Sequence, residues 1–157
     1  MIGFLIFQKI KVVGMFRKII FIIFCFFPFF SNASVNSYIN CFTSNDQKGI
    51  NLKFVTINDG GRDKWLGGYV KYEKSNYPIT VVPIKESAEE FTEGRPYEYT
   101  TTWIEIINGK PEGKYITVRQ GAIFSSFVYI NTKSKKRYDF TQVFDAMNDG
   151  SCQWKKR

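Results

Sequence analysis

The 157-residue sequence contains no histidine, and this absence excludes several kinds of chemistry. Histidine is the commonest general base in enzymes, and the Ser-His-Asp and Cys-His arrangements of hydrolases depend on it. Histidine-based metal centres are excluded for the same reason. The carboxylate pair of glycoside hydrolases remains, but Glu98 and Glu105 are an odd number of positions apart and project from opposite faces of a strand. The sequence therefore predicts a protein that is not an enzyme and that needs no cofactor or metal.

Phosphate-binding glycine patterns and long amphipathic helices are also missing. The pairs Gly60-Gly61 and Gly67-Gly68 lack the strand-to-helix context and the Lys-Ser ending of a phosphate loop. Such pairs are typical of tight turns, of bulges and of close approaches between strands. Residues 86–93 have the helical character that the rest of the mature chain lacks, with Ser87 as an N-cap and Glu90 as its capping-box partner. We expect one short helical turn near 86–93 in an otherwise all-β chain.

Residues 1–33 have the features of a cleaved secretory signal peptide. Four basic residues precede the apolar run of residues 19–30, and small side chains at Ser31 and Ala33 suit signal peptidase. The competing interpretation, an uncleaved anchor, is weakened because this run is shorter than the roughly 20 residues of a membrane-spanning helix. We therefore predict cleavage after Ala33 and export to the periplasm or the medium, with no membrane span in the mature chain.

The mature chain, residues 34–157, has the length of a single compact domain. Met15 heads a more compact signal than Met1 does, so either methionine is a candidate for the start of translation. Loss of the signal lowers the formal net charge from +8 to +4, because its four charged residues are all basic. Much of the basicity is therefore targeting chemistry, which removes most of the argument for nucleic acid as a partner.

Two cysteines, Cys41 and Cys152, remain near the two ends of the mature chain. In an exported protein an even pair predicts a disulfide. Two free thiols or half of a metal site are the alternatives, but the mature chain has no third cysteine to complete a coordination shell. The predicted Cys41–Cys152 bridge would close almost the whole domain and would stabilise it by restricting the unfolded chain.

Alternation of side chains is clearest over residues 96–130, which predicts three consecutive antiparallel strands. The pair Asn108-Gly109 within this segment is the strongest hairpin signal in the chain. One face of the first strand carries most of the aromatic rings, so we expect it to face the core. This face is made by Tyr97, Tyr99, Thr101 and Trp103.

Shorter strands are expected on both sides of this segment. Pro83 cannot donate a hydrogen bond to a ladder, so its strand belongs at an edge or is paired on one side there. About eight short strands with turns at regular spacing predict an antiparallel up-and-down meander that forms a small barrel or a sandwich. The flanking strands are expected over residues 37–43, 50–57, 65–74, 79–85 and 137–144.

Two groups of charged residues are the predicted sites of partner binding. Charged loops on a rigid β scaffold suit the recognition of a protein of opposite charge. The first group surrounds the expected helical turn, and the second lies in a basic turn before the last strand. The candidates are Glu89, Glu90, Glu93 and Arg95 in the first group and Lys133, Lys135, Lys136 and Arg137 in the second.

Small size, one disulfide and the missing catalytic groups favour a monomeric, exported binding protein without enzymatic activity. The expected partner is an envelope or secreted protein, as for an inhibitor or a toxin-immunity protein. One alternative is a β-barrel that binds a small apolar or lipidic ligand among inward aromatic side chains. Another alternative is an assembly factor of an envelope or secretion system. A ligand carrier would need a cavity where a recognition scaffold has a packed core.

Overall fold

The computed structural model describes residues 34–46, 49–61 and 64–154 and divides the chain after Asn32. All the described residues lie in the unit that follows this boundary. The predicted signal peptide, residues 1–33, lies outside the described residues. Within the described part, no helix is long and apolar enough to cross a membrane.

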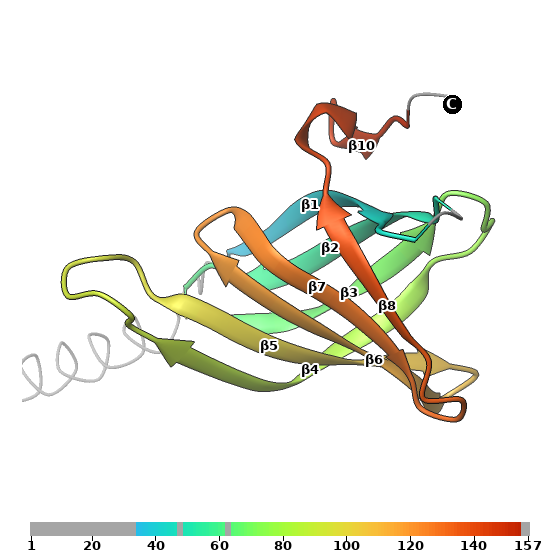
Figure 1. Ribbon diagram of the computed structural model, residues 1–157, viewed down its shortest axis with the longest axis horizontal. Coiled ribbons are helices and arrows are strands. Elements are labelled where there is room, and N and C mark those ends of the chain that lie inside the picture. Colours follow the sequence, from blue (N-terminus) through green and yellow to red (C-terminus); the bar gives the residue numbers. More distant parts are fainter. Residues whose placement is uncertain (1–33, 47–48, 62–63, 155–157) are drawn as a thin grey trace, which may run out of the picture. The chain divides into compact units, whose positions relative to one another are not determined.

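Eight antiparallel strands close into an up-and-down barrel in which each strand pairs with its neighbours in sequence and β8 returns to β1 (Figure 1). The predicted all-β meander of about eight strands is confirmed, and of the two predicted architectures the barrel is the one formed. The strands are β1 (Val35–Ser44), β2 (Asn51–Asp59), β3 (Lys64–Tyr72), β4 (Ile79–Glu89), β5 (Glu98–Ile107), β6 (Lys110–Gln120), β7 (Ile123–Asn131) and β8 (Arg137–Gln142).

Side chains from all eight strands fill the inside of the barrel and form one hydrophobic core. Aromatic rings dominate it: the Phe54 ring centroid lies 5.3 Å from that of Trp103 and 5.2 Å from that of Phe127, both in edge-to-face geometry. Such a core needs the alternation of inward and outward residues along every strand. Its buried members are Phe42, Leu52, Phe54, Val70, Val81, Trp103, Tyr115, Phe127 and Phe140.

The predicted helical turn near 86–93 is wrong, because β4 continues as a strand through Glu89. Ser87 does not cap a helix but lies opposite Thr100 of β5. The Glu90 carboxylate instead accepts a hydrogen bond from the backbone N–H of Gly94, at 3.0 Å, and so closes the β4–β5 loop. A single helical turn is too short to be stable by itself, so the longer ladder with β5 prevails over a local capping signal.

The Asn108-Gly109 turn is confirmed. Both residues have positive φ, 50° and 74°, as a two-residue hairpin turn requires. β6 therefore begins at Lys110, directly after this turn. The register of the β5–β6 pair shifts between Glu105 and Ile106, because Glu112 of β6 is an extra residue between Gly113 and Pro111.

The Gly67-Gly68 pair fulfils the prediction of a bulge or a close approach of strands. The β2–β3 register shifts between Ile57 and Asn58, because Leu66, next to this pair, is an extra residue in β3. A Cβ atom added to Gly68 would collide with the backbone carbonyl oxygen of Val55. Glycine at this position therefore allows two adjacent strands to lie unusually close together.

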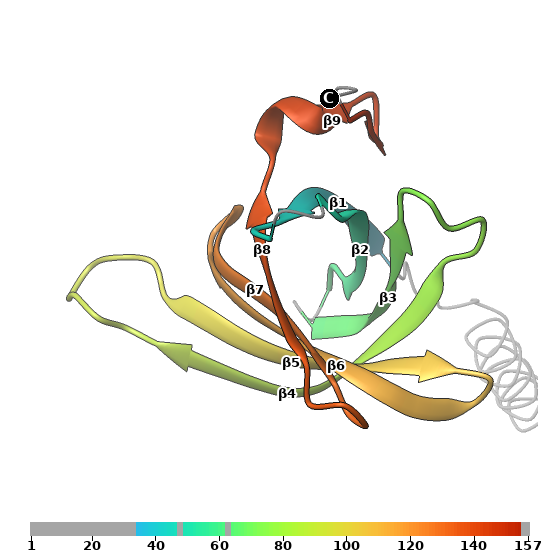
Figure 2. The ribbon, with the colours of Figure 1, turned by 45° about the vertical axis from the view of Figure 1, so that its right-hand side comes forward.

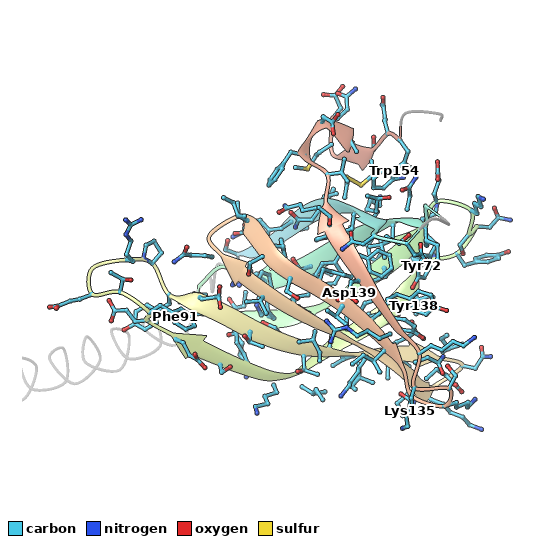
Figure 3. All side chains as sticks on the ribbon, viewed as in Figure 1. Tyr72, Phe91, Lys135, Tyr138, Asp139 and Trp154 are labelled. Atoms are coloured by element: carbon cyan, nitrogen blue, oxygen red, sulfur yellow. A yellow bond between two sulfur atoms is a disulfide. The ribbon has the colours of Figure 1, made fainter. Side chains whose placement is uncertain are left out.

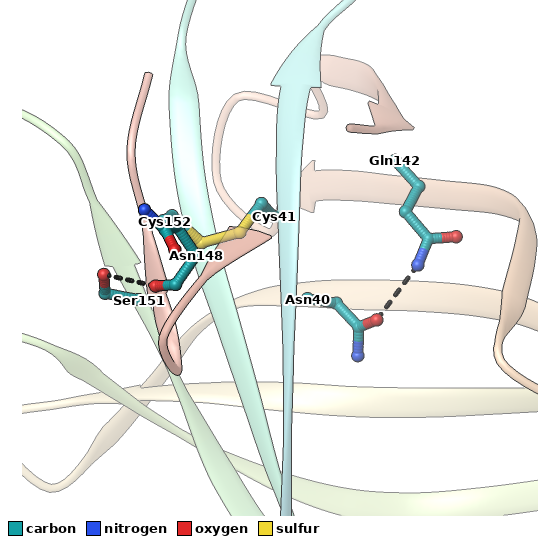
Figure 4. The surroundings of a disulfide bond; sticks show 6 residues. All are labelled: Asn40, Cys41, Gln142, Asn148, Ser151 and Cys152. Atoms are coloured by element: carbon teal, nitrogen blue, oxygen red, sulfur yellow. Dashed lines mark hydrogen bonds between the residues drawn. A yellow bond between two sulfur atoms is a disulfide. The ribbon is translucent and has the colours of Figure 1, made fainter. Parts of the chain in front are cut away.

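The chain after β8 returns across the barrel wall and is fixed there by the predicted disulfide (Figure 4). Cys41 of β1 and Cys152 are bonded, with Cα atoms 5.7 Å apart. The segment between β8 and Cys152 contains short elements that the sequence did not predict, because they have only two or three residues each. They are η1 (Phe144–Ala146), β9 (Met147–Asn148) and β10 (Ser151–Cys152).

Candidate functional site

The β4–β5 hairpin reaches beyond the barrel and forms an arm, which we define as residues 82–98 (Figures 1 and 2). β3 and β4 pair at three positions, the last being Gly68 opposite Val81. From Val82 to Glu89, β4 pairs with β5, and no second strand of the described residues pairs with it. We call residues 82–89 the open edge. The prediction that the strand of Pro83 is paired on one side there is therefore confirmed.

The two faces of the open edge differ in chemistry. A register shift between Pro83 and Lys85 places Ile84 in a bulge, where its side chain is 61% exposed. Beyond the bulge, Glu86 accepts a hydrogen bond from the hydroxyl of the buried Thr101, at 3.0 Å, so it lies on the face continuous with the barrel interior. Side chains alternate along a strand, so Lys85, Ser87 and Glu89 lie on the opposite, outer face.

Large apolar side chains are exposed along the arm and beside it. Phe91, at the tip of the arm, is 70% exposed (Figure 3), and Tyr97 is 47% exposed. Leu66 in β3 and Ile123 at the start of β7 are exposed at the same end of the meander. Exposed aromatic side chains on a projecting hairpin, with charged residues between them, are typical of a protein–protein contact surface.

The predicted acidic group lies on the arm. Glu89 ends β4, and Glu90, Glu93 and Arg95 are exposed in the loop between β4 and β5. Residues 82–98 contain five glutamates against one lysine and one arginine, so the arm is negatively charged. The structure therefore brings the first group of candidates together on one projecting element.

The predicted basic group lies at the other end of the meander, because alternate turns of an up-and-down barrel share an end. Figure 3 shows Lys135 and the arm residue Phe91 at the two ends. Two of the four basic candidates form salt bridges with acidic residues of the same chain. The Lys133 ammonium lies 2.7 Å from the Glu112 carboxylate. The Arg137 guanidinium lies 2.6 Å from Asp139 and holds the pKa of that carboxyl below its usual range.

A cluster of tyrosines around Glu105 occupies the inside of the barrel near the basic end. Glu105 is 3% exposed. Its two carboxylate oxygens accept hydrogen bonds from the hydroxyls of Tyr115, at 3.0 Å, and Tyr129, at 3.2 Å. The Tyr115 hydroxyl also shares a 3.0 Å hydrogen bond with that of Tyr72. We call these four residues the Glu105 cluster.

Burial changes the acid–base behaviour of this cluster. Loss of water raises the pKa of Glu105, although the hydrogen bonds from Tyr115 and Tyr129 oppose this effect. Burial also raises the pKa of Tyr72 to about 12, and it raises the pKa of Tyr115 and of Tyr129. The three tyrosines are therefore protonated hydrogen-bond donors at neutral pH, and Glu105 keeps its proton to a higher pH than an exposed glutamate does.

A buried carboxyl with a raised pKa is a common feature of catalytic acids, so the partner groups of Glu105 decide what it can do. Both of its oxygens are engaged by tyrosine hydroxyls. Glu98, the other carboxylate considered from the sequence, accepts a hydrogen bond from Ser125 at 3.4 Å, at the arm end of β5. The two carboxylates do not converge, and the arrangement is that of an internal hydrogen-bond network.

Arg119 closes the arm end of the barrel interior. Its guanidinium carbon lies 4.9 Å from the ring centroid of Trp65 and 4.9 Å from that of Tyr99. One of its terminal nitrogens donates a hydrogen bond to the Gly121 carbonyl at 3.4 Å. A guanidinium held between two aromatic faces is stabilised by cation–π attraction, so Arg119 joins β3, β5 and β6 where β3 and β4 separate.

The sequence contained a signal for these interior residues that the prediction did not use. The face of β5 that carries Thr101 and Trp103 continues, two residues further, to Glu105. Pairing across the Asn108-Gly109 turn then places Tyr115 opposite Trp103. Extending the alternation along the whole strand would have identified a carboxylate inside the barrel.

No protein-family model, curated protein or solved structure matches this chain. Within residues 34–46, 49–61 and 64–154, there is no group of three or more metal-ligating side chains.

Proposed function

We propose that this protein is an exported, non-enzymatic binding protein that recognises an envelope or secreted protein through its arm, in the manner of an inhibitor or a toxin-immunity protein. The observation that carries the proposal is the contrast between a filled barrel and a hairpin that projects from it. Loops and hairpins held by a rigid scaffold are where binding residues concentrate. The Cys41–Cys152 disulfide is compatible with the oxidising compartment that export implies.

The packed interior favours protein recognition over the binding of a small ligand. A ligand-carrying barrel holds its ligand in a cavity lined by apolar side chains. In this barrel Phe42, Phe54 and Trp103 are at most 1% exposed, and the rings of Phe42 and Phe127 lie 4.2 Å apart between centroids. The centre of the barrel is therefore occupied by its own side chains.

The chemistry of the arm indicates the kind of partner. Its five glutamates favour a basic surface, and charge complementarity of this kind accelerates association and selects the partner. Phe91 and Tyr97 supply exposed rings beside these charges, and aromatic residues are enriched among the side chains that dominate binding energy. The proposed partner is thus a basic protein surface with an apolar centre.

The test uses the purified protein as bait for envelope and secreted proteins of its source, with two charge-reversed variants. Glu89→Lys with Glu93→Lys alters the arm, and Lys135→Glu with Lys136→Glu alters the basic turn by the same number of charges. These four side chains are all exposed, so the variants should fold. We expect the arm variant to lose the partner and the turn variant to retain it.

Two results would contradict the proposal. If the turn variant loses the partner and the arm variant keeps it, the contact lies at the opposite end of the barrel. If no protein is captured and native mass spectrometry shows a retained small molecule, the protein is a ligand carrier.

A further inference from the structure

The open edge of β4 leaves main-chain hydrogen-bonding groups without a strand partner on one side. Residues 82–89 pair with β5, while β3 diverges after the Gly68–Val81 pair. Such an edge is a template on which another strand can add by main-chain hydrogen bonds. The order of charges along this edge indicates which strand would fit.

We propose that the open edge pairs with the same edge of a second copy of this chain, antiparallel and centred on Ser87. In this register Lys85 of each copy lies opposite Glu89 of the other, and Glu86 lies opposite Ala88. Each pair occurs twice because the interface is two-fold symmetric. Directly opposed charges of unlike sign stabilise an antiparallel pair.

Symmetry restricts the registers that compete with this one. A two-fold axis that joins two edges antiparallel is perpendicular to the sheet, so it keeps the outer faces of both copies on one side. The axis must then pass at a residue and not between two residues, because opposed side chains share a face.

Neighbouring registers place like charges opposite each other. If the two-fold axis passes at Lys85, Glu86 or Glu89, that residue lies opposite the same residue of the other copy. If the axis passes at Ala88, Glu86 of one copy lies opposite Glu90 of the other. Like charges in direct opposition destabilise a strand pair. Among the centres from residue 85 to residue 89, Ser87 alone combines two pairs of unlike charge with no pair of like charge.

The geometry of the arm suits this pairing. Lys85, Ser87 and Glu89 all lie on the outer face, where long side chains can meet across the junction. Antiparallel pairing directs the two acidic loops, residues 90–97, toward opposite ends of the junction, which separates their charges. The two β4–β5 hairpins would form one continuous sheet between two barrels. The sequence alone favoured a monomer, and this proposal departs from that expectation.

The first experiment measures the mass of the purified protein over a range of concentrations by analytical ultracentrifugation. We expect the mass to rise from that of one chain toward that of two. Lys85→Glu should weaken the dimer roughly tenfold, because it converts two attractive pairs into two repulsive ones. Adding Glu89→Lys to this variant should restore the wild-type dissociation constant. Lys135→Glu, at the opposite end of the barrel, is the matched control and should leave it unchanged.

The second experiment tests the register in a Cys25→Ser background, so that the introduced cysteine is the free thiol of the chain whether or not residues 1–33 have been removed. Ser87→Cys places a thiol at the two-fold axis, so oxidation should link two chains. Ser134→Cys, exposed in the β7–β8 turn, is the control and should link far more slowly. A single-chain mass at every concentration would overturn the proposal. So would a dimer that Lys85→Glu does not weaken, or equal linkage rates at residues 87 and 134.

Discussion

The barrel and the arm share the strands β4 and β5, yet the side chains on one face of β5 are buried in the barrel and become exposed toward the arm. Inside the barrel Thr101 and Trp103 are each 1% exposed. Further along the same face, toward the arm, Tyr99 is half-buried, and Tyr97, which lies in the arm just before β5 begins, is exposed. Alternation identifies which side chains share a face, whereas the presence of a covering layer decides whether that face is a core. Here the covering layer ends where β3 leaves β4.

This difference separates side chains that stabilise the fold from exposed side chains along one hairpin. In the barrel, each large side chain touches side chains from several strands, so its loss is felt by the whole fold. In the β4–β5 loop of the arm the side chains are exposed, so their substitution should have little effect on folding. Residues on the arm can therefore vary while the barrel stays constant.

The largest effect is expected from truncating the barrel half of this face. Trp103→Ala should lower the free energy of unfolding by about 4 kcal/mol, because it removes a fully buried ring and leaves a cavity. Tyr97→Ala, on the same face in the arm, should change it by less than about 0.5 kcal/mol. Urea denaturation of both variants makes the measurement. Equal losses would show that the arm is as tightly packed as the barrel.

Removing the disulfide should come next in size. Replacing Cys41 and Cys152 together by serine should cost about 3 kcal/mol, because the bridge closes a loop with a sequence separation of 111 residues. Several strands separate the arm from the bridge. The hydrogen-exchange rates of residues 82–98 under native conditions should therefore be the same as in the wild-type protein. Selective loss of protection in the arm would mean that the two regions are coupled.

The Glu105 cluster should make the stability of the barrel depend on pH. The pKa of Glu105 is raised in the folded state, so its contribution to stability is fully present below the ordinary pKa of 4.5 and is lost as the pH rises through the folded value. Glu105→Gln removes this titration and should raise the free energy of unfolding at pH 7 relative to wild type, because the folded protein no longer has to bury an ionised carboxylate. Thermal denaturation between pH 3 and 7 measures the difference, which should vanish at the acidic end. A difference that is constant across this range would contradict the assignment.

The smallest effect on stability is expected at the tip of the arm. Phe91→Ala should change the free energy of unfolding by less than about 0.5 kcal/mol, since the ring is 70% exposed. If the proposed function holds, the same substitution should weaken partner binding by roughly tenfold or more, because exposed aromatic anchors carry much of the binding energy. Calorimetry with the captured partner measures the binding. A loss of stability with unchanged binding would reverse the roles of the two regions.

The fold was largely predictable because its signals are local and repeated. Asn108-Gly109 fixes a hairpin, and period-two alternation fixes the faces of the strands beside it. The helical turn failed because a capping pattern at Ser87 and Glu90 describes what a segment can do alone, whereas the ladder with β5 depends on a distant partner. The arm could not be predicted for a similar reason. Pro83 indicated one-sided pairing, but the point where β3 diverges is a property of the closed barrel.

The candidate site was predictable in its charges and less so in its arrangement. The acidic and basic groups were both identified from composition. Their positions at opposite ends follow because successive turns of an up-and-down barrel lie at alternate ends. The alternation of side chains along β5 predicts that Glu105 faces the interior, whereas the contacts of Arg119 could not be predicted. Its contact with Trp65 joins β6 to β3, and no pattern in the sequence predicts that these two residues are in contact.

The junction between β1 and β8 has a consequence for how the chain folds. The closing seam consists of three residue pairs, from Phe42–Gln142 to Ser44–Phe140, between the first and last strands of the barrel. Contacts between such distant segments form slowly, because a long loop must close before they gain any stability. One cysteine of the disulfide is Cys41, the residue next to Phe42. Once the disulfide forms, it holds the chain after β8 close to β1, so the pairing of β1 with β8 no longer requires a long loop to close. Oxidation should therefore determine the rate at which the barrel closes as well as its final stability.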